Sequence, residues 1–313
     1  FVKGHMYFLP GSDIQMTNGT IEFFGDNSSG IYVNETARMF NLRSNKNVGS
    51  FLGTSPTSDH DLYIHGNFTN MTDRVFKHQY PGTIHLKGSF VNNILGAFWF
   101  NDGTISFDGS SNQSFTNNST LICYFNNVII ATSNNATFSL NEDIEVKGSL
   151  TIDSGVLQSN NYTICLEGNW NNNVGEAAFI EGDGALVLNG TGNQYLINEH
   201  FGTIDLNKTS GEMIIPEGSV VTCDKYNWTA GVYRVSGGTF TAAMRLVQPG
   251  IFGSIYLDSG TINYHQDEFT RNDFNGTIYI NGGAFNVYGG SDDCYWAGTA
   301  SAALYMTDGV FDF

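Results

Sequence analysis

A short motif recurs along this chain at intervals of about 22 residues. Each copy has an apolar–X–apolar triplet, then a polar residue and a glycine-containing turn. The last four copies begin at Tyr233, Ile255, Ile278 and Leu304, with steps of 22, 23 and 26 residues. Earlier copies begin at Leu62, Ile84 and Ile105, and at Ile164, Leu186 and Ile204. A repeat of this length, with period-two alternation and no helical periodicity, predicts a β-solenoid.

The expected fold is all-β, a right-handed parallel β-helix with roughly 22 residues per coil, in which each strand pairs with its equivalent one coil away. Alternation places Ile255, Leu257, Ile278 and Ile280 inside, in a continuous aliphatic core. The glycine that ends each motif supplies the positive φ of the corner. An antiparallel sandwich also has short strands and glycine turns, but it does not require equivalent residues to recur every 22 positions.

The repeat is less regular near the N-terminus. We expect residues 1–60 to form a cap or contact region and residues 61–313 to form the solenoid repeats. The final segment, Gly309-Val310-Phe311-Asp312-Phe313, is apolar and carries no polar cap. Solenoid ends expose unpaired strand edges. The expected partner is therefore the rest of a longer chain or another copy of this one, in contact through the solenoid ends.

Charge excludes some classes of partner. The chain has 13 Lys and Arg against 30 Asp and Glu, a formal net charge of −17. Nucleic-acid binding requires cations that neutralise phosphates, so we expect no nucleic-acid partner. No run of 18 apolar residues is present, so we expect no membrane span.

The sequence is rich in Asn-X-Ser/Thr sequons. There are 14, against about 6 expected by chance from the composition. Asn-Gly-Thr is also good turn chemistry, which leaves both a structural and a glycosylation interpretation open. We expect an extracellular or cell-surface location. The candidate glycosylation sites are Asn18, Asn27, Asn34, Asn67, Asn70, Asn112, Asn117, Asn118, Asn135, Asn161, Asn189, Asn207, Asn227 and Asn275.

A family resemblance rests on the stretches Val128–Ile130, Asp143–Leu157, Tyr162–Ile164, Gly168–Trp170, Gly184–Gly192 and Ile204–Lys208. These resemble the β-helical repeats of giant secreted surface adhesins, such as type IX secretion cargo of Bacteroidetes, and similar archaeal surface-layer glycoproteins. The resemblance covers about residues 120–283 and is loose before that. It implies a fold and a location, and it brings no catalytic motif. No type IX sorting domain is visible.

The most distinctive candidate surface is an outward row. If Ile255 and Leu257 face inward, then Arg234, Tyr256, Tyr279 and Tyr305 face outward in neighbouring coils. Stacked aromatics can bind sugar rings or an apolar face of another protein. They can equally serve to stabilise adjacent strands by stacking on each other. The equivalent earlier positions are Tyr63, His85 and Ser106, and then Cys165, Val187 and Asp205.

Chemistry-bearing groups are sparse. Catalysis on a solenoid needs carboxylates and bases from adjacent coils, and the candidates are Asp258, Asp292 and Asp293 with Arg234. The densest histidine group, Asp59-His60-Asp61 with His65, lacks a metal-binding spacing. We expect no metal site and no cofactor. Calcium is compatible with the acidity, but no calcium motif is present.

The four cysteines, Cys123, Cys165, Cys223 and Cys294, lack zinc-type spacing. Both disulfides and unpaired thiols remain open.

These observations favour an extracellular structural or adhesive protein without catalytic activity, such as a stalk, filament, sheath or surface-layer component. The alternative is a carbohydrate-active solenoid, either a polysaccharide-binding module or a lyase or hydrolase. Surface glycans are then a candidate partner. An enzyme should show a groove in which carboxylates and a base converge from three adjacent coils, whereas a stalk should show none.

Overall fold

The predicted β-solenoid is confirmed. The structure, a computed structural model, describes residues 1–11, 15–33, 36–47, 52–54, 60–71, 75–79, 81–93, 96–244, 252–266, 276–288 and 303–312. Strands make up 63% of it, and the coils repeat at roughly 22 residues. All strand pairs described in register are parallel, for example Ile84 with Ile105. One 3-10 turn, η1 (Glu176–Ala178), is the only helical element among the described residues.

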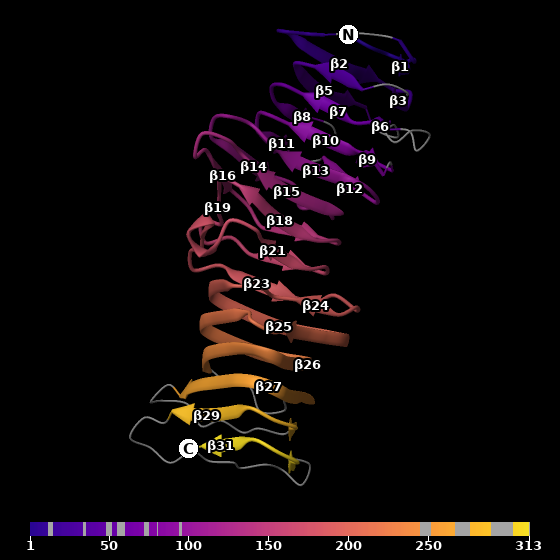
Figure 1. Cartoon of the computed structure of the whole chain (residues 1–313). Coiled ribbons are helices and arrows are strands. Elements are labelled where there is room, and N and C mark those ends of the chain that lie inside the picture. Colours follow the sequence, from indigo (N-terminus) through magenta and orange to yellow (C-terminus); the bar gives the residue numbers. More distant parts are fainter. Residues whose placement is uncertain are drawn as a thin grey trace. The chain divides into compact units, whose positions relative to one another are not determined.

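The chain divides into two compact units, which we describe separately. Unit 1 comprises residues 1–162 and 177–180, and unit 2 comprises residues 163–176 and 181–313. Within each unit, Figure 1 shows successive strands lying one above another, with unit 1 beginning in indigo and unit 2 ending in yellow.

Unit 1 contains three parallel sheets. The first has the order β1 (Met6–Phe8), β3 (Ser29–Val33), β6 (Leu52–Thr54), β9 (Val75–His78) and β12 (Ala97–Phe100). The second includes β4 (Ala37–Met39), β7 (Leu62–Ile64), β10 (Thr83–Leu86), β13 (Thr104–Phe107), β15 (Asn127–Ala131) and β18 (Leu150–Ser154). The third has the order β2 (Thr20–Gly25), β5 (Asn41–Lys46), β8 (Phe68–Asn70), β11 (Phe90–Asn92), β14 (Gln113–Asn117), β16 (Thr137–Leu140), β19 (Val156–Gln158) and β22 (Phe179–Ile180). Strand β17 (Ile144–Val146) forms a parallel bridge to Phe125 through Val146.

Segment 1–60, expected to be a cap or contact region, contributes strands to all three of these sheets. Its strand β5, for example, pairs in parallel with β8 of the next coil, from Leu42 opposite Phe68 onward.

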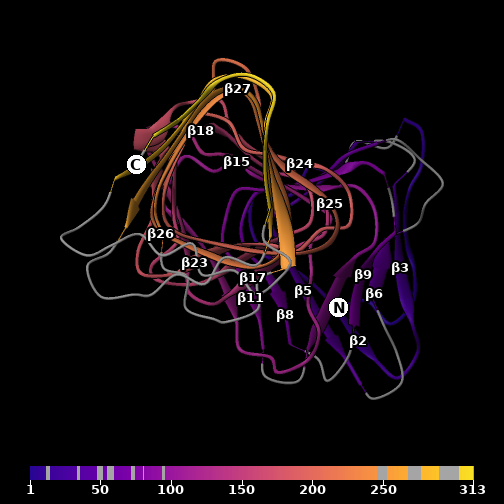
Figure 2. The same cartoon turned by 90° about the horizontal axis from the view of Figure 1, so that it is seen from below.

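Unit 2 is built on one parallel sheet in which several strands bend around corners. Its main path runs through β20 (Ile164–Leu166), β23 (Ala185–Leu188), β25 (Glu199–Ile215), β26 (Val220–Met244), β27 (Phe252–Gln266), β28 (Thr277–Ile280) and β30 (Ala303–Met306). Strand β24 (Gln194–Tyr195) pairs with β25, and β29 (Ala284–Tyr288) pairs with β27 and β31 (Val310–Asp312). Strand β21 (Trp170–Asn172) bridges to Leu196. Viewed end-on in Figure 2, β25, β26 and β27 curve around a common interior.

The register of the sheets matches the sequence repeat. Tyr233 lies opposite Ile255, Ile255 opposite Ile278, and Ile278 opposite Leu304. The earlier triplets align in the same way, Leu62 with Ile84 and Ile164 with Leu186. The predicted inward residues Ile255, Leu257, Ile278 and Ile280 are all at most 5% exposed. Spacing alone therefore fixed both the pairing and the facing of these strands.

The core of unit 1 is not purely aliphatic, because buried phenylalanines pack among its isoleucine, leucine and valine side chains. Phe125 is fully buried, and its ring centroid lies 4.6 Å from that of Phe98 and 4.9 Å from that of Phe100. Phe90 and Phe115 pack at 5.4 and 5.5 Å from the same ring. Edge-to-face and tilted pairs of this kind add to the stabilisation from burial alone.

At one corner of the unit 2 coils, the stacked positions Gly260 and Gly283 can be occupied only by glycine. Gly260 and Gly283 have φ values of 91° and 84°, as the turn prediction requires. A Cβ at Gly260 would collide with the carbonyl oxygen of Gly238 in the preceding coil, and one at Gly283 would collide with that of Gly260. The corner is therefore closed both by conformation and by the close approach of neighbouring coils.

Candidate functional site

The structure aligns the predicted outward row of unit 2. Arg234 lies opposite Tyr256, Tyr256 opposite Tyr279, and Tyr279 opposite Tyr305, on strands β26, β27, β28 and β30. The Tyr256 and Tyr279 rings are stacked with centroids 4.6 Å apart, and the Tyr279 and Tyr305 rings are stacked at 5.3 Å. The guanidinium carbon of Arg234 lies 4.4 Å from the centroid of the Tyr256 ring.

This stacking covers the ring faces. Tyr279 has a tyrosine on each face, and Tyr256 lies between Tyr279 and the Arg234 guanidinium. A sugar ring that binds an aromatic side chain packs on its face. Among the described residues, the outer face of Tyr305 is the one ring face of this row without a stacked ring or guanidinium. The arrangement therefore fits strand stabilisation better than a sugar-binding platform.

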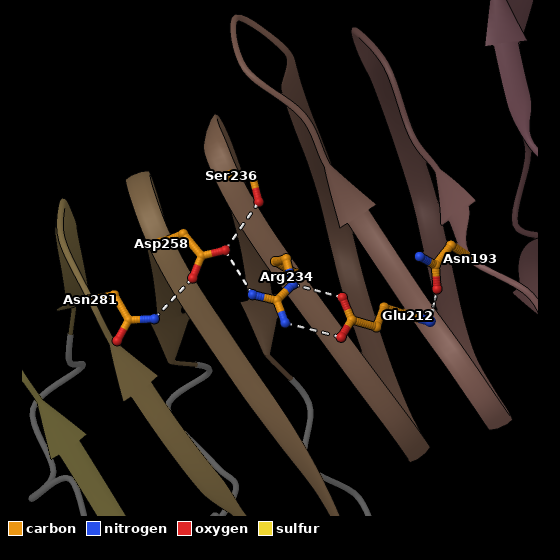
Figure 3. A network of polar contacts seen from close by, with 6 residues as sticks. All are labelled: Asn193, Glu212, Arg234, Ser236, Asp258 and Asn281. Atoms are coloured by element: carbon orange, nitrogen blue, oxygen red, sulfur yellow. Dashed lines mark hydrogen bonds and ion pairs between the residues drawn. The ribbon is translucent and has the colours of Figure 1, made fainter.

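Arg234 also organises a polar network on the same surface (Figure 3). Its Nε and Nη2 donate to the two carboxylate oxygens of Glu212 at 2.7 and 3.0 Å. Its Nη1 donates to Asp258 Oδ2 at 2.7 Å. Asp258 also accepts hydrogen bonds from Ser236 Oγ at 3.3 Å and Asn281 Nδ2 at 2.9 Å.

The backbone N–H of Glu212 donates to Asn193 Oδ1 at 3.1 Å, which extends the network by one more turn. The network thus joins residues of β25, β26 and β27 with the turns that flank them. Bidentate Arg–carboxylate pairs of this kind are strong and geometrically specific.

The electrostatics of this network oppose acid–base chemistry. Hydrogen bonds to Glu212 raise the pKa of Arg234 above its ordinary range. Burial alone would raise the pKa of Asp258, but hydrogen bonds from Arg234 and Asn281 hold it below its ordinary value. A carboxylate held as an anion and paired with arginine is a poor proton donor near neutral pH. Of the candidate catalytic set, the structure brings together Asp258 and Arg234, and Asp292 and Asp293 lie outside the described residues.

Two further charged clusters were missed at the sequence level, and both centre on a histidine. In unit 1, His85 Nδ1 lies 2.8 Å from Asp108 Oδ2 and His85 Nε2 lies 3.6 Å from Asp61 Oδ2. In unit 2, His200 Nε2 lies 3.2 Å from Glu181 Oε1 and 3.7 Å from Asp224 Oδ2.

In each cluster the carboxylates come from the coil before and the coil after the histidine. The Arg234 network has the same arrangement, with Glu212 before and Asp258 after. Carboxylates and a base from three adjacent coils were the expected mark of an enzyme. Because this arrangement recurs three times, once with arginine at its centre, it is typical of a device that links coils.

A buried carboxylate lies beside His200. Glu199 is 3% exposed, and its Oε2 accepts hydrogen bonds from Trp170 Nε1 at 3.1 Å and Asn172 Nδ2 at 2.8 Å. Its Oε1 accepts the backbone N–H of His200 at 3.1 Å. Burial raises the pKa of Glu199 to about 7, although these hydrogen bonds favour the charged form. Its burial makes Glu199 a structural group rather than a site for substrate.

A buried lysine occupies a comparable position in unit 2. Lys208 is 1% exposed, and its Nζ donates to Gly190 O at 2.6 Å, Gly192 O at 2.9 Å and Gln194 Oε1 at 2.6 Å. Burial lowers the pKa of Lys208 to about 8. Gln194 in turn donates to Leu166 O and Gly168 O, which fixes the turn that the lysine fills.

The sequons differ in accessibility. Asn70 is completely buried, and its Nδ2 donates to Asn92 Oδ1 and Ala97 O, so in the folded protein it is a core residue and not a glycan acceptor. Asn227 is half-buried and its Nδ2 donates to Asp205. Asn117 is half-buried. Asn34 and Asn275 lie outside the described residues. The exposed sequon asparagines are Asn18, Asn27, Asn67, Asn112, Asn118, Asn135, Asn161, Asn189 and Asn207.

Several turn asparagines, including sequon residues, link coils through the side-chain carbonyl. Asn67 Oδ1 accepts the backbone N–H of Ser89 at 2.8 Å, and Asn112 Oδ1 accepts that of Thr137 at 3.0 Å. A glycan attaches to the side-chain nitrogen. This use of the oxygen leaves Asn67 and Asn112 able to carry one.

The metal and thiol candidates have structural roles or lie outside the described residues. Asp61 Oδ1 accepts the backbone N–H of Thr83 at 2.8 Å, His60 and His65 are exposed, and Asp59 is not described. Among the described residues, no group of three or more His, Cys, Asp or Glu side chains is arranged to hold a metal ion.

Cys123 and Cys223 are buried thiols without a disulfide, and burial raises the pKa of both. Cys165 is half-buried, and Cys294 is outside the described residues. No helix in the described part of the chain is long and apolar enough to cross a membrane.

Comparison with known proteins found no match to any family model, curated protein or solved structure.

Proposed function

We propose that this chain is part of an extracellular structural or adhesive surface protein, such as a stalk, filament, sheath or surface-layer component, and that it has no catalytic activity. The observation that carries the proposal is the use of the outward side chains. Arg234, Tyr256 and Tyr279 contact their neighbours in adjacent coils, and so do His85 and His200. An outer surface that ties coil to coil suits a protein whose task is mechanical.

The same contacts argue against the carbohydrate-active alternative. The faces of Tyr256 and Tyr279 are covered, and the carboxylates of Glu212 and Asp258 are paired with Arg234. A polysaccharide lyase or hydrolase needs a carboxyl group or base that can exchange a proton with substrate. An aromatic binding platform needs open ring faces.

The extracellular location is supported by the exposed sequons and by the resemblance to repeats of secreted surface adhesins. Nine of the sequon asparagines are exposed, among them Asn67. Carbohydrate on such positions adds to the solubility that the net charge of −17 provides.

Glycopeptide mass spectrometry of the protein isolated from its source tests the location. Asn67 and Asn70 form a matched pair, since they lie three residues apart in neighbouring sequons and differ in burial. We expect glycan on Asn67 and on other exposed sites, and none on Asn70. Native protein without glycan on any exposed sequon would count against the proposal. Glycan on Asn70 would contradict the structural placement of that residue.

The absence of catalysis is tested on the same preparation. We expect no release of unsaturated or reducing ends from a panel of acidic and neutral polysaccharides. Turnover that is lost on Arg234→Met or Asp258→Asn substitution would replace the structural proposal with the carbohydrate-active one.

A further inference from the structure

Among the described residues, one arrangement occurs three times on the outside of the units. A basic side chain sits between two carboxylates, one from the coil before it and one from the coil after it. We call each such group a charge triad. The three triads are Asp61–His85–Asp108, Glu181–His200–Asp224 and Glu212–Arg234–Asp258. In the third the central cation is permanent, whereas in the first two it exists only when the imidazole is protonated.

The His85 triad is packed on one side by an aromatic ring. Tyr63 stacks on His85 with centroids 4.3 Å apart and an interplanar angle of 5°, and Arg38 lies over Tyr63 at 5.7 Å. The charged and titratable groups around His85 are therefore Asp61 and Tyr63 from the coil before, with Arg38 beyond, and Asp108 from the coil after. Asp108 Oδ1 is buried without a hydrogen-bond partner among the described residues.

The His200 triad is oriented by a hydroxyl group. His200 Nδ1 and Thr222 Oγ1 lie 2.7 Å apart, which directs Nε2 toward Glu181 and Asp224. Burial raises the pKa of Glu181, with Asp224 adding to the rise and His200 opposing it. Glu199 is adjacent on the same strand, and Glu176 acts on Glu181. The two charged side chains that contact His200 among the described residues, Glu181 and Asp224, are both acidic.

We propose that the His85 and His200 triads are pH-sensitive links that tighten their coils when the histidine is protonated. A neutral imidazole carries no charge and offers a single N–H, so neither carboxylate of the triad is paired with a positive charge. Protonation places a positive charge between the two carboxylates, as the guanidinium does in the Arg234 triad. In the His85 triad it also gives each carboxylate its own N–H donor, whereas in the His200 triad both carboxylates face Nε2 and Nδ1 faces the Thr222 hydroxyl. The links therefore strengthen as the medium becomes more acidic.

Other groups in the chain also respond to pH over this range. Burial lowers the pKa of His78 to about 4, so its protonation opposes folding as the medium becomes acidic. The raised pKa of Glu199 acts in the opposite direction. The proposal therefore concerns the difference between matched variants, in which these two contributions cancel.

Hydrogen–deuterium exchange of the full chain, corrected for the intrinsic rate at each pH, tests the proposal coil by coil. The variants are His85→Gln and His200→Gln, which cannot gain charge, and His85→Arg and His200→Arg, which copy the Arg234 triad. Peptides covering β7, β10 and β13 report on His85, and those covering β25 and β26 report on His200.

Relative to the Gln variants, we expect the wild-type peptides to become roughly threefold more protected at about pH 5.5 than at about pH 8, the scale of a partly exposed ion pair. The Arg variants should show the higher protection at both values. If wild type and Gln variants change equally with pH, the proposal is wrong.

If a Gln variant does not fold, the comparison of wild type with the Arg variant decides the matter. A gap in protection at about pH 8 that closes at about pH 5.5 supports the proposal. A gap of constant size overturns it.

Discussion

Replacing Lys208 with methionine should remove a specific pH dependence from the stability of unit 2. The ammonium group is 1% exposed and has three oxygen acceptors, two backbone carbonyls and the Gln194 amide, with no carboxylate among them. Because no anion compensates the charge, burial lowers its pKa from 10.5 to about 8. The methionine side chain keeps most of the apolar stem and cannot ionise.

The size of the effect follows from linkage. Between about pH 8 and pH 10.5 the unfolded chain holds the Lys208 proton while the folded chain has released it. Stability from this group therefore rises with pH through that window and is constant below about pH 8. The gap of about 2.5 pH units corresponds to at most about 3 kcal/mol, at about 1.4 kcal/mol per unit.

Urea unfolding followed by circular dichroism at about pH 7.5 and about pH 9.5 measures the effect. We expect the wild type to gain about 2 kcal/mol relative to Lys208→Met between these values. Lys87→Met, at an exposed lysine, is the matched control and should follow the wild type. Tyrosines and cysteines that titrate in this range are common to all three proteins and cancel. Parallel pH profiles for wild type and Lys208→Met would refute the reasoning.

Two further predictions concern the core and the buried carboxylate. Phe125→Ala should destabilise unit 1 by about 3–5 kcal/mol in urea unfolding, because it opens a cavity among packed rings. Tyr124→Ala, at the neighbouring outward residue, should cost about 1 kcal/mol or less, and similar losses for the two variants would contradict the assigned facing. Glu199→Gln should abolish a loss of stability that the wild type shows as pH rises from 4.5 to about 7, since the folded state holds the proton more tightly in that range; an unchanged pH profile would show that Glu199 is already ionised.

The backbone arrangement was largely predictable because parallel coils force equivalent residues into register. The steps between Tyr233, Ile255, Ile278 and Leu304 identified the partners, and period-two alternation identified the facing. The same alternation also predicts that the sequon residue Asn70 is buried. It follows Phe68 by two positions on β8 and therefore points inward, which is where the structure places it.

The charge triads could not be read from the repeat alone. Three of their carboxylates, Asp61, Asp108 and Glu181, lie directly beside strand ends, where spacing varies. Glu181 precedes His200 by 19 residues, and Asp224 follows it by 24. The period-two alternation shows which residues face outward, but it does not show which carboxylate comes within contact distance of the central basic side chain.

The buried phenylalanines of unit 1 were not predicted, for a different reason. The clearest sequence repeats lie in unit 2, and the inward residues named from them, such as Ile255 and Leu257, are aliphatic.

The central claim, that the protein is an extracellular structural or adhesive component, is tested most directly by immunogold electron microscopy of intact, unpermeabilised cells of the source organism. We expect label on the outer surface, on a stalk, filament, sheath or surface layer. Label that appears only inside the cells after permeabilisation would contradict the claim.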